Sequence, residues 1–237
     1  MSGFPTEPMQ TELGQSPSVP WTAGDVWQGL GIVILLGLTF SALLYYFLLS
    51  FPPSEYGSFI GMAELLLLVP VWILGLRKYG ANLRTLGFRK FKSADLGLGC
   101  AFMILAYSFN ACYAIILAPF NLRIQSDITP LIASFSSPLM MALSIVVIGP
   151  LVEEVFFRGF VFTGLRQNFG WKKAALISAA IFAIFHLELT FVIPGFILGF
   201  IFAFLYQRSN SIWPGIIMHI LVNAVGLLST ILINQMS

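Results

Sequence analysis

Seven long apolar runs, separated by short polar segments, dominate the pattern along the chain. The runs cover Val26–Phe51, Gly57–Leu76, Leu96–Ala118, Pro138–Leu165, Trp171–Leu187, Phe191–Tyr206 and Ile212–Ile233. A helix needs about 20 apolar residues to cross the hydrocarbon core of a bilayer, so each run suits one crossing. The runs lack the strict alternation of barrel strands, and backbone groups in lipid must be hydrogen-bonded internally. The pattern therefore predicts an all-α, polytopic transmembrane helical bundle of about seven helices, or eight, enclosing a polar cavity.

The beginning of the chain differs from this pattern. Residues 1–24 are polar, rich in Pro, Ser, Thr and Gly, and contain no Lys or Arg. A signal peptide would begin with a basic segment, whereas this composition is typical of a disordered tail. We therefore expect a disordered N-terminal tail at 1–24 and a single transmembrane domain at 25–237. Most of the ionisable residues that lie inside apolar runs fall in about 138–234, so we expect the catalytic core of the domain there.

Composition supports this assignment to the membrane. The 237 residues are 58% hydrophobic and 9% charged, whereas a soluble domain carries roughly 25% charged residues. Lipid must therefore cover much of the surface. The net charge of +2, without a basic block that includes aromatic residues, does not indicate nucleic acid. Cys100 and Cys112 fall in one apolar run without metal or disulfide spacing, and we predict that both are buried free thiols.

Basic residues occur mainly in alternate loops of the seven-helix arrangement. The second, fourth and sixth loops contain Arg77, Lys78, Arg84, Arg89, Lys90, Lys92, Arg166, Lys172, Lys173 and Arg208. Of the loops on the opposite side, only one holds a basic residue, Arg123. Cytoplasmic loops carry the excess of Lys and Arg, so the N-terminus is predicted to be cytoplasmic. We expect a multi-pass integral membrane protein, in the plasma membrane if the organism is a prokaryote.

Several ionisable residues lie inside the apolar runs, where each charge costs at least about 2.5–3.5 kcal/mol. Glu154 and Arg158 are four residues apart and share a helix face, so they should pair. Glu153 is turned by about 100° from Glu154 and has no local partner. Such a carboxyl group suits a general acid or base. The alternative is a structural ion pair with a protonated Glu153 that braces the bundle. Glu64, in the second run, could line the cavity or pair with a neighbour.

The only two histidines of the chain, His186 and His219, also lie in apolar runs. Phe182 precedes His186 by one helical turn, and Asn223 follows His219 by one turn. A carboxylate and an imidazole can deprotonate a water molecule, and an imidazole and an amide can donate hydrogen bonds to an oxyanion. The same groups could instead hold a divalent metal such as zinc. The H-E-x-x-H pattern of soluble zinc proteases is absent.

Three motifs in this order resemble those of a known family. They are E-E-x-x-x-R (Glu153, Glu154, Arg158), F-x-x-x-H (Phe182, His186) and H-x-x-x-N (His219, Asn223). Together they resemble the CPBP family, which comprises CAAX prenyl endopeptidases and bacteriocin-processing enzymes and is also called the Abi family of intramembrane proteases. The resemblance covers about Arg84 to Asn223. Each motif alone is weak, but three in sequence on successive polar helices are specific.

The resemblance implies an intramembrane endopeptidase that cuts near the C-terminus of a membrane-associated or prenylated, CAAX-type substrate. Glu153 would activate water with His186 as its partner, and His219 with Asn223 would form the oxyanion site. Glu154, Arg158 and Phe182 would support these groups. The family is often called metalloprotease, yet a metal-free glutamate mechanism is also argued for its CAAX branch. We expect no tightly held metal. A bound metal would be held by Glu153, His186 and His219.

Two other functions are compatible with the same residues. A non-catalytic membrane scaffold or regulator could keep the fold and bind a partner membrane protein. A proton-coupled transporter could use the polar groups as a relay, although no internal repeat supports that function. For the peptidase, the expected partners are a peptide or lipidated-protein substrate and the lipid bilayer, and no nucleic acid.

Overall fold

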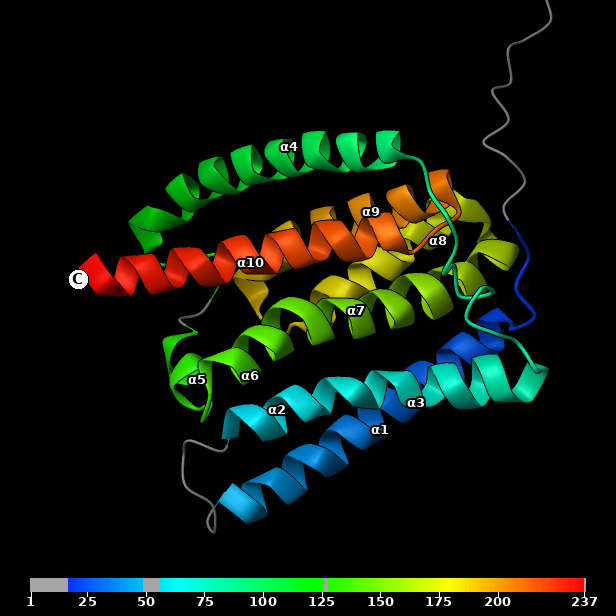
Figure 1. Cartoon of the computed structure of the whole chain (residues 1–237), viewed down its shortest axis with the longest axis horizontal. Coiled ribbons are helices and arrows are strands. Elements are labelled where there is room, and N and C mark those ends of the chain that lie inside the picture. The colour runs from blue at the N-terminus through cyan, green and yellow to red at the C-terminus, as the bar shows by residue number, and fades with distance from the viewer. Residues whose placement is uncertain (1–16, 49–55, 126–127, 237) are drawn as a thin grey trace, which may run out of the picture.

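A computed structural model describes residues 17–48, 56–125 and 128–236, and helices make up most of this part of the chain. The helices lie side by side along the long axis of the molecule, with α4 and α1 on opposite sides of the view in Figure 1. Within the described ranges no strand occurs. The predicted all-α membrane bundle is therefore confirmed.

The first half of the chain forms three long helical segments. These are α1 (Ala23–Leu48), the rod made of α2 (Tyr56–Glu64), η2 (Leu65–Leu67), α3 (Leu68–Pro70) and η3 (Val71–Arg77), and α4 (Ser93–Leu117) with η4 (Ala118–Phe120). The rod changes from α to 3₁₀ to π geometry around Pro70, whose missing N–H interrupts the regular ladder. The short helix α5 (Thr129–Ala133) follows.

The second half contains one very long helical segment and two further helices. The long segment comprises α6 (Pro138–Ala142), η5 (Leu143–Ile148), α7 (Gly149–Glu154), η6 (Val155–Phe162) and α8 (Thr163–Phe185); then come η7 (Leu189–Phe191), α9 (Val192–Ser209) and α10 (Trp213–Met236). Gly170 interrupts α8 with φ 72° and ψ 160°, and the chain folds back there. Ser178 donates a hydrogen bond of 3.0 Å to the Phe157 carbonyl, so the second limb of α8 packs against η6.

Five helical stretches of the described residues are long and apolar enough to cross a membrane. They are Ala23–Tyr46, Ser93–Phe120, Pro138–Phe185, Leu189–Ser209 and Trp213–Leu232. The predicted count of seven differs for two reasons. Pro138–Phe185 joins two predicted runs through the turn at Gly170, and the rod Tyr56–Arg77 is not among the five stretches, which are counted over the described residues only.

The predicted tail differs from the structure in its last part. Residues 1–16 lie outside the described residues, but residues 17–22 pack against the bundle. The Trp21 side chain is fully buried, and its Nε1–H donates a hydrogen bond of 3.0 Å to the Phe160 carbonyl. Burial of a large indole ring whose N–H has a hydrogen-bond partner stabilises this packing.

The basic loops gather at one end of the bundle, as the alternation of loops predicts. The segment between η3 and α4 lies beside the turn between α9 and α10 (Figure 1). Ser211 donates a hydrogen bond of 2.6 Å to the Arg89 carbonyl, and Arg208 pairs with Asp95 at 3.1 Å. Which side of the membrane this end faces stays a prediction.

The two cysteines differ from the prediction. Cys100 and Cys112 are free, but both are exposed rather than buried. They belong to α4, which lies at the edge of the bundle (Figure 1). A helix at the edge of a membrane bundle turns apolar residues toward lipid, so an apolar position there is no sign of burial in protein.

Candidate active site

Three segments carry the polar residues that the sequence singles out. The α7–η6 segment holds Glu153, Glu154 and Arg158, and α10 holds His219 and Asn223. The end of α8 holds Phe182, and His186 follows directly as its C-cap residue. Because α8 folds back on η6, and α10 packs against both α7 and α9, residues far apart in the sequence meet in the bundle.

The predicted ion pair between Glu154 and Arg158 is present. The Glu154 Oε1 and Arg158 Nη1 atoms are 2.9 Å apart, and both side chains are fully buried. Arg158 Nη2 also donates a hydrogen bond of 3.1 Å to the Gly199 carbonyl. The guanidinium lies 4.5 Å from the centre of the Phe182 ring, a cation–π arrangement. The pair therefore links the η6, α8 and α9 segments.

His219 contacts both glutamates. Its Nδ1 is 3.2 Å from Glu154 Oε1, and its Nε2 is 3.8 Å from Glu153 Oε2. The imidazole stacks on the Phe202 ring with 5.0 Å between the ring centres. A carboxylate can only accept hydrogen bonds, so Nδ1 donates its proton to Glu154. The contact leaves Nε2 facing Glu153.

Glu153 is the more accessible of the two glutamates. Its side chain is 19% exposed, whereas that of Glu154 is 0% exposed. Within the described part of the chain its Oε2 atom is buried and has no hydrogen-bond partner. A buried carboxylate oxygen normally has a partner, and such an orphan is typical of a site that takes a water molecule or a substrate. Glu153 thus has the position expected of a general base.

His186 does not contact Glu153 in the way that the family resemblance implies. Its Nδ1 donates a hydrogen bond of 2.9 Å to the Phe182 carbonyl, since a carbonyl can only accept. Its ring lies between the rings of Phe182 and Phe191, at 4.8 and 4.7 Å. The imidazole next to Glu153 is that of His219. The neutral form of His186 keeps a free lone pair on Nε2.

Asn223 lies one turn after His219 and has a backbone partner. Its Nδ2 donates a hydrogen bond of 2.9 Å to the Ile145 carbonyl in η5. This bond joins α10 to the segment that leads into Glu153. The described residues provide no acceptor for the second N–H of the amide, and an oxyanion role for Asn223 stays a prediction.

Two glycines make room for carboxylates, and the motifs do not reveal either one. A Cβ atom at Gly215 would lie 2.8 Å from Glu154 Oε2, and one at Gly149 would lie 2.6 Å from Glu64 Oε2. Glu64 therefore reaches the start of α7, one helical turn before Glu153. The sequence alone indicated Glu64 only as a cavity-lining or paired residue. Its approach to Gly149 depends on how α2 packs against α7.

The residues that a metal would need do not form a suitable group. In residues 17–48, 56–125 and 128–236, no three His, Cys, Asp or Glu side chains are arranged to hold a metal ion. The described side chains therefore do not fit a metal centre.

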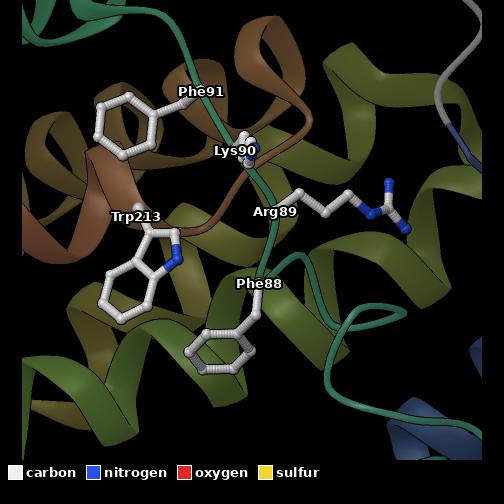
Figure 2. A pocket seen from close by; sticks show the side chains of 5 residues that line it. All are labelled: Phe88, Arg89, Lys90, Phe91 and Trp213. Carbon is white, nitrogen blue, oxygen red and sulfur yellow. The ribbon is translucent and has the colours of Figure 1, made fainter.

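A separate hollow lies at the basic end of the bundle. It has a volume of about 470 Å³ and is lined by Phe88, Arg89, Lys90, Phe91 and Trp213. Figure 2 shows the three aromatic rings on one side of the loop, while Arg89 extends to the other side. The Phe88 and Trp213 rings meet edge to face at 5.4 Å. None of the glutamates or histidines described above lines this hollow.

Known proteins are similar to the part of this chain that contains Glu153, Glu154, Arg158 and His219. Residues 135–225 match the model of the family described as type II CAAX prenyl endopeptidase Rce1-like. The "Putative membrane peptidase YdiL" of Bacillus subtilis is 41% identical over 86 residues, 36% of this chain and 35% of that protein. The "UPF0177 protein YxdF" of Lactococcus lactis is 35% identical over 81 residues, 34% of this chain and 44% of that protein.

The alignments thus span less than half of each of these curated relatives. No solved structure gives a significant match. The matched segment begins before α6 and ends within α10, so it contains all seven residues of the three motifs. The resemblance predicted from the motifs is therefore confirmed, and it lies in residues 135–225, which are similar to the Rce1-like type II CAAX prenyl endopeptidases.

Proposed function

We propose that the protein is an intramembrane endopeptidase that cuts near the C-terminus of a membrane-associated substrate, with a prenylated CAAX-type end as the preferred class. The observation that carries this proposal is the convergence of Glu153, Glu154, Arg158 and His219 in one cluster. The cluster lies in the segment that matches the endopeptidase model. Charged groups this deep in a membrane bundle are costly and are retained for function.

In the proposed reaction Glu153 removes a proton from a water molecule, and the resulting hydroxide attacks the scissile carbonyl carbon. The exposed part of the Glu153 side chain supports this role. The proton then passes to the leaving amine as the peptide bond breaks. General base and acid catalysis by one carboxyl group contributes typically about 10²–10⁴-fold to the rate.

His219 is proposed to stabilise the oxyanion. Its Nδ1 faces Glu154, so an imidazolium would donate Nε2–H toward the reacting carbonyl while Glu154 balances the charge. Arg158 and Phe202 keep this arrangement in place, since one pairs with Glu154 and the other stacks on the imidazole. Asn223 would add a second donor from the next turn. His186 would hold the water through its free Nε2 atom.

The experiment uses the full chain, purified and reconstituted in liposomes. One peptide ends in a farnesylated cysteine followed by two aliphatic residues and one variable residue, and a matched peptide lacks the prenyl group. Mass spectrometry identifies the products. We expect cleavage after the modified cysteine, and a rate loss of about 10²–10⁴-fold in Glu153→Gln. Asp95→Asn, an acidic position at the basic end of the bundle, serves as the control.

Each alternative predicts a different outcome. A Glu153→Gln variant that keeps the wild-type rate would contradict the proposed base. Equal cleavage of both peptides would contradict the preference for a prenylated end. A scaffold would cleave neither peptide in any variant. A transporter would show proton flux in the same liposomes, lost in Glu153→Gln, without peptide products.

A further inference from the structure

A third carboxyl group approaches the site from a helix outside the matched segment. Glu64 ends α2, and the three atoms nearest to a Cβ built on Gly149 all belong to its carboxylate, at 2.6, 3.1 and 3.1 Å. The carboxylate of Glu64 therefore lies directly on the backbone of Gly149. Any residue other than glycine at this position would move it.

The position of Gly149 brings Glu64 near Glu153. Residues four apart share one helix face, and Gly149 precedes Glu153 by four positions. A helical side chain leans toward the N-terminus and covers the preceding turn, so Glu153 extends over the turn that contains Gly149. The two carboxyl groups thus approach the same space from α2 and α7.

Both carboxyl groups have an atom without a partner. Among the residues that the structure describes, Glu64 Oε2 and Glu153 Oε2 are buried and accept no hydrogen bond. Two neighbouring carboxylates repel each other, and each unpaired buried oxygen carries a desolvation cost. One shared proton removes both costs, because a carboxylic acid can donate to a carboxylate.

We propose that Glu64 is a positioning residue that holds the Glu153 carboxylate through a shared proton. The bond fixes the Glu153 carboxylate from the α2 side while His219 approaches it from the α10 side. Glu64 acts on the reaction through Glu153 and does not contact the substrate. The role belongs to α2, which lies outside the segment matched by the family model.

The first test does not depend on activity. Infrared spectra of the wild-type protein in liposomes should contain the C=O stretch of a hydrogen-bonded carboxylic acid. The band should be lost in Glu64→Gln and shifted in Gly149→Ala, because the new Cβ displaces the carboxylate. Gly97→Ala on α4, where a Cβ meets nothing within 4 Å, is the matched control. A spectrum that is the same in all four proteins would overturn the proposal.

The second test is kinetic and rests on the proposed peptidase activity. Glu64→Met fills the space without a hydrogen bond, and we expect kcat to fall by about 10- to 100-fold with KM unchanged. Glu64→Gln, whose amide can donate to Glu153, should restore most of kcat. If Glu64→Met has the wild-type kcat, Glu64 only fills space and the positioning role is wrong.

A double-mutant cycle separates this role from a general effect on packing. Gly149→Ala should lower kcat in the wild-type background and have no further effect in Glu64→Ala, because the clashing carboxylate is then absent. Additive losses would contradict the contact between Glu64 and Gly149. If the wild-type protein cleaves neither the prenylated peptide nor the matched peptide without a prenyl group, the proposed function is wrong. The infrared spectra alone then decide whether Glu64 shares a proton with Glu153.

Discussion

At the scale of single residues, the side chains of the cluster differ in which of their atoms already have an ion-pair or hydrogen-bond partner. Glu154 has an ion pair with Arg158 and a contact to His219, and it is fully buried. Glu153 is partly exposed and keeps an oxygen without a partner in the described chain. Two adjacent glutamates therefore have different environments, and this is the usual way in which a site separates a supporting carboxylate from a reactive one.

Gly215 offers a test of the supporting role of Glu154. A Cβ at this position would lie 2.8 Å from Glu154 Oε2, so Gly215→Ala should displace the carboxylate and with it His219. We expect kcat for the prenylated peptide to fall by about 10- to 100-fold, because small displacements of catalytic groups are costly. Gly226→Ala on the same helix meets nothing within 4 Å and is the control. Equal kcat values for Gly215→Ala and Gly226→Ala would contradict the supporting role of Glu154.

At the scale of the elements, the site depends on the close approach of α8 and α9. A Cβ at Gly199 in α9 would lie 2.9 Å from the Cα of Ala179 in α8. The Gly195 and Gly199 spacing is typical of close helix packing, and both glycines lie against α8. The same glycine has a second role that the spacing does not indicate, because its carbonyl accepts a hydrogen bond from Arg158.

Gly199→Ala should therefore lower the stability of the bundle. The neighbouring atom belongs to the backbone of α8 and cannot move alone, so we expect a loss of about 1–3 kcal/mol from overpacking. Thermal unfolding in detergent, followed by circular dichroism, measures the change. Gly31→Ala in α1, where a Cβ meets nothing within 4 Å, should unfold at or above the wild-type temperature. If Gly199→Ala has the same unfolding temperature as Gly31→Ala, the close contact between α8 and α9 is contradicted.

At the scale of the whole molecule, segments distant in sequence close the bundle around the polar cluster. The chain before α1 packs on η6 through Trp21, and the loop before α4 joins the turn before α10. α2 contacts α7 from the other half of the chain. The matched segment is thus enclosed by elements that the family model does not cover, so the fold of the site depends on the whole chain.

Trp21 tests this dependence. Its side chain is fully buried against Phe160 and donates a hydrogen bond to the Phe160 carbonyl. Trp21→Ala should reduce the free energy of unfolding by about 3–5 kcal/mol, as is usual for loss of a buried aromatic side chain. Trp27→Ala removes an indole that is 50% exposed, and it should cost much less. Equal unfolding temperatures for both variants would mean that the segment before α1 does not stabilise the bundle.

The fold class and the residues of the cluster follow from the sequence alone. Apolar runs of bilayer length require helices, because lipid offers no partner for backbone groups. The spacing of Glu154 and Arg158 places them on one face, and the ion pair is present. These are local properties, which depend on residues within a few helical turns. For the same reason the three motifs are recognisable along the linear chain, whatever the packing of the helices that carry them.

The contacts between helices could not be predicted from the sequence. The sequence does not say that His219 rather than His186 lies beside Glu153, or that Glu64 rests on Gly149. The predictions for the end of the N-terminal segment and for the burial of Cys100 and Cys112 were also wrong. These features depend on the rotation and packing of helices that are far apart in the chain, and apolar patterning is the same for lipid-facing and protein-facing positions. The contacts within the cluster are therefore a consequence of tertiary packing, whereas the residues that form it can be recognised from the local motifs.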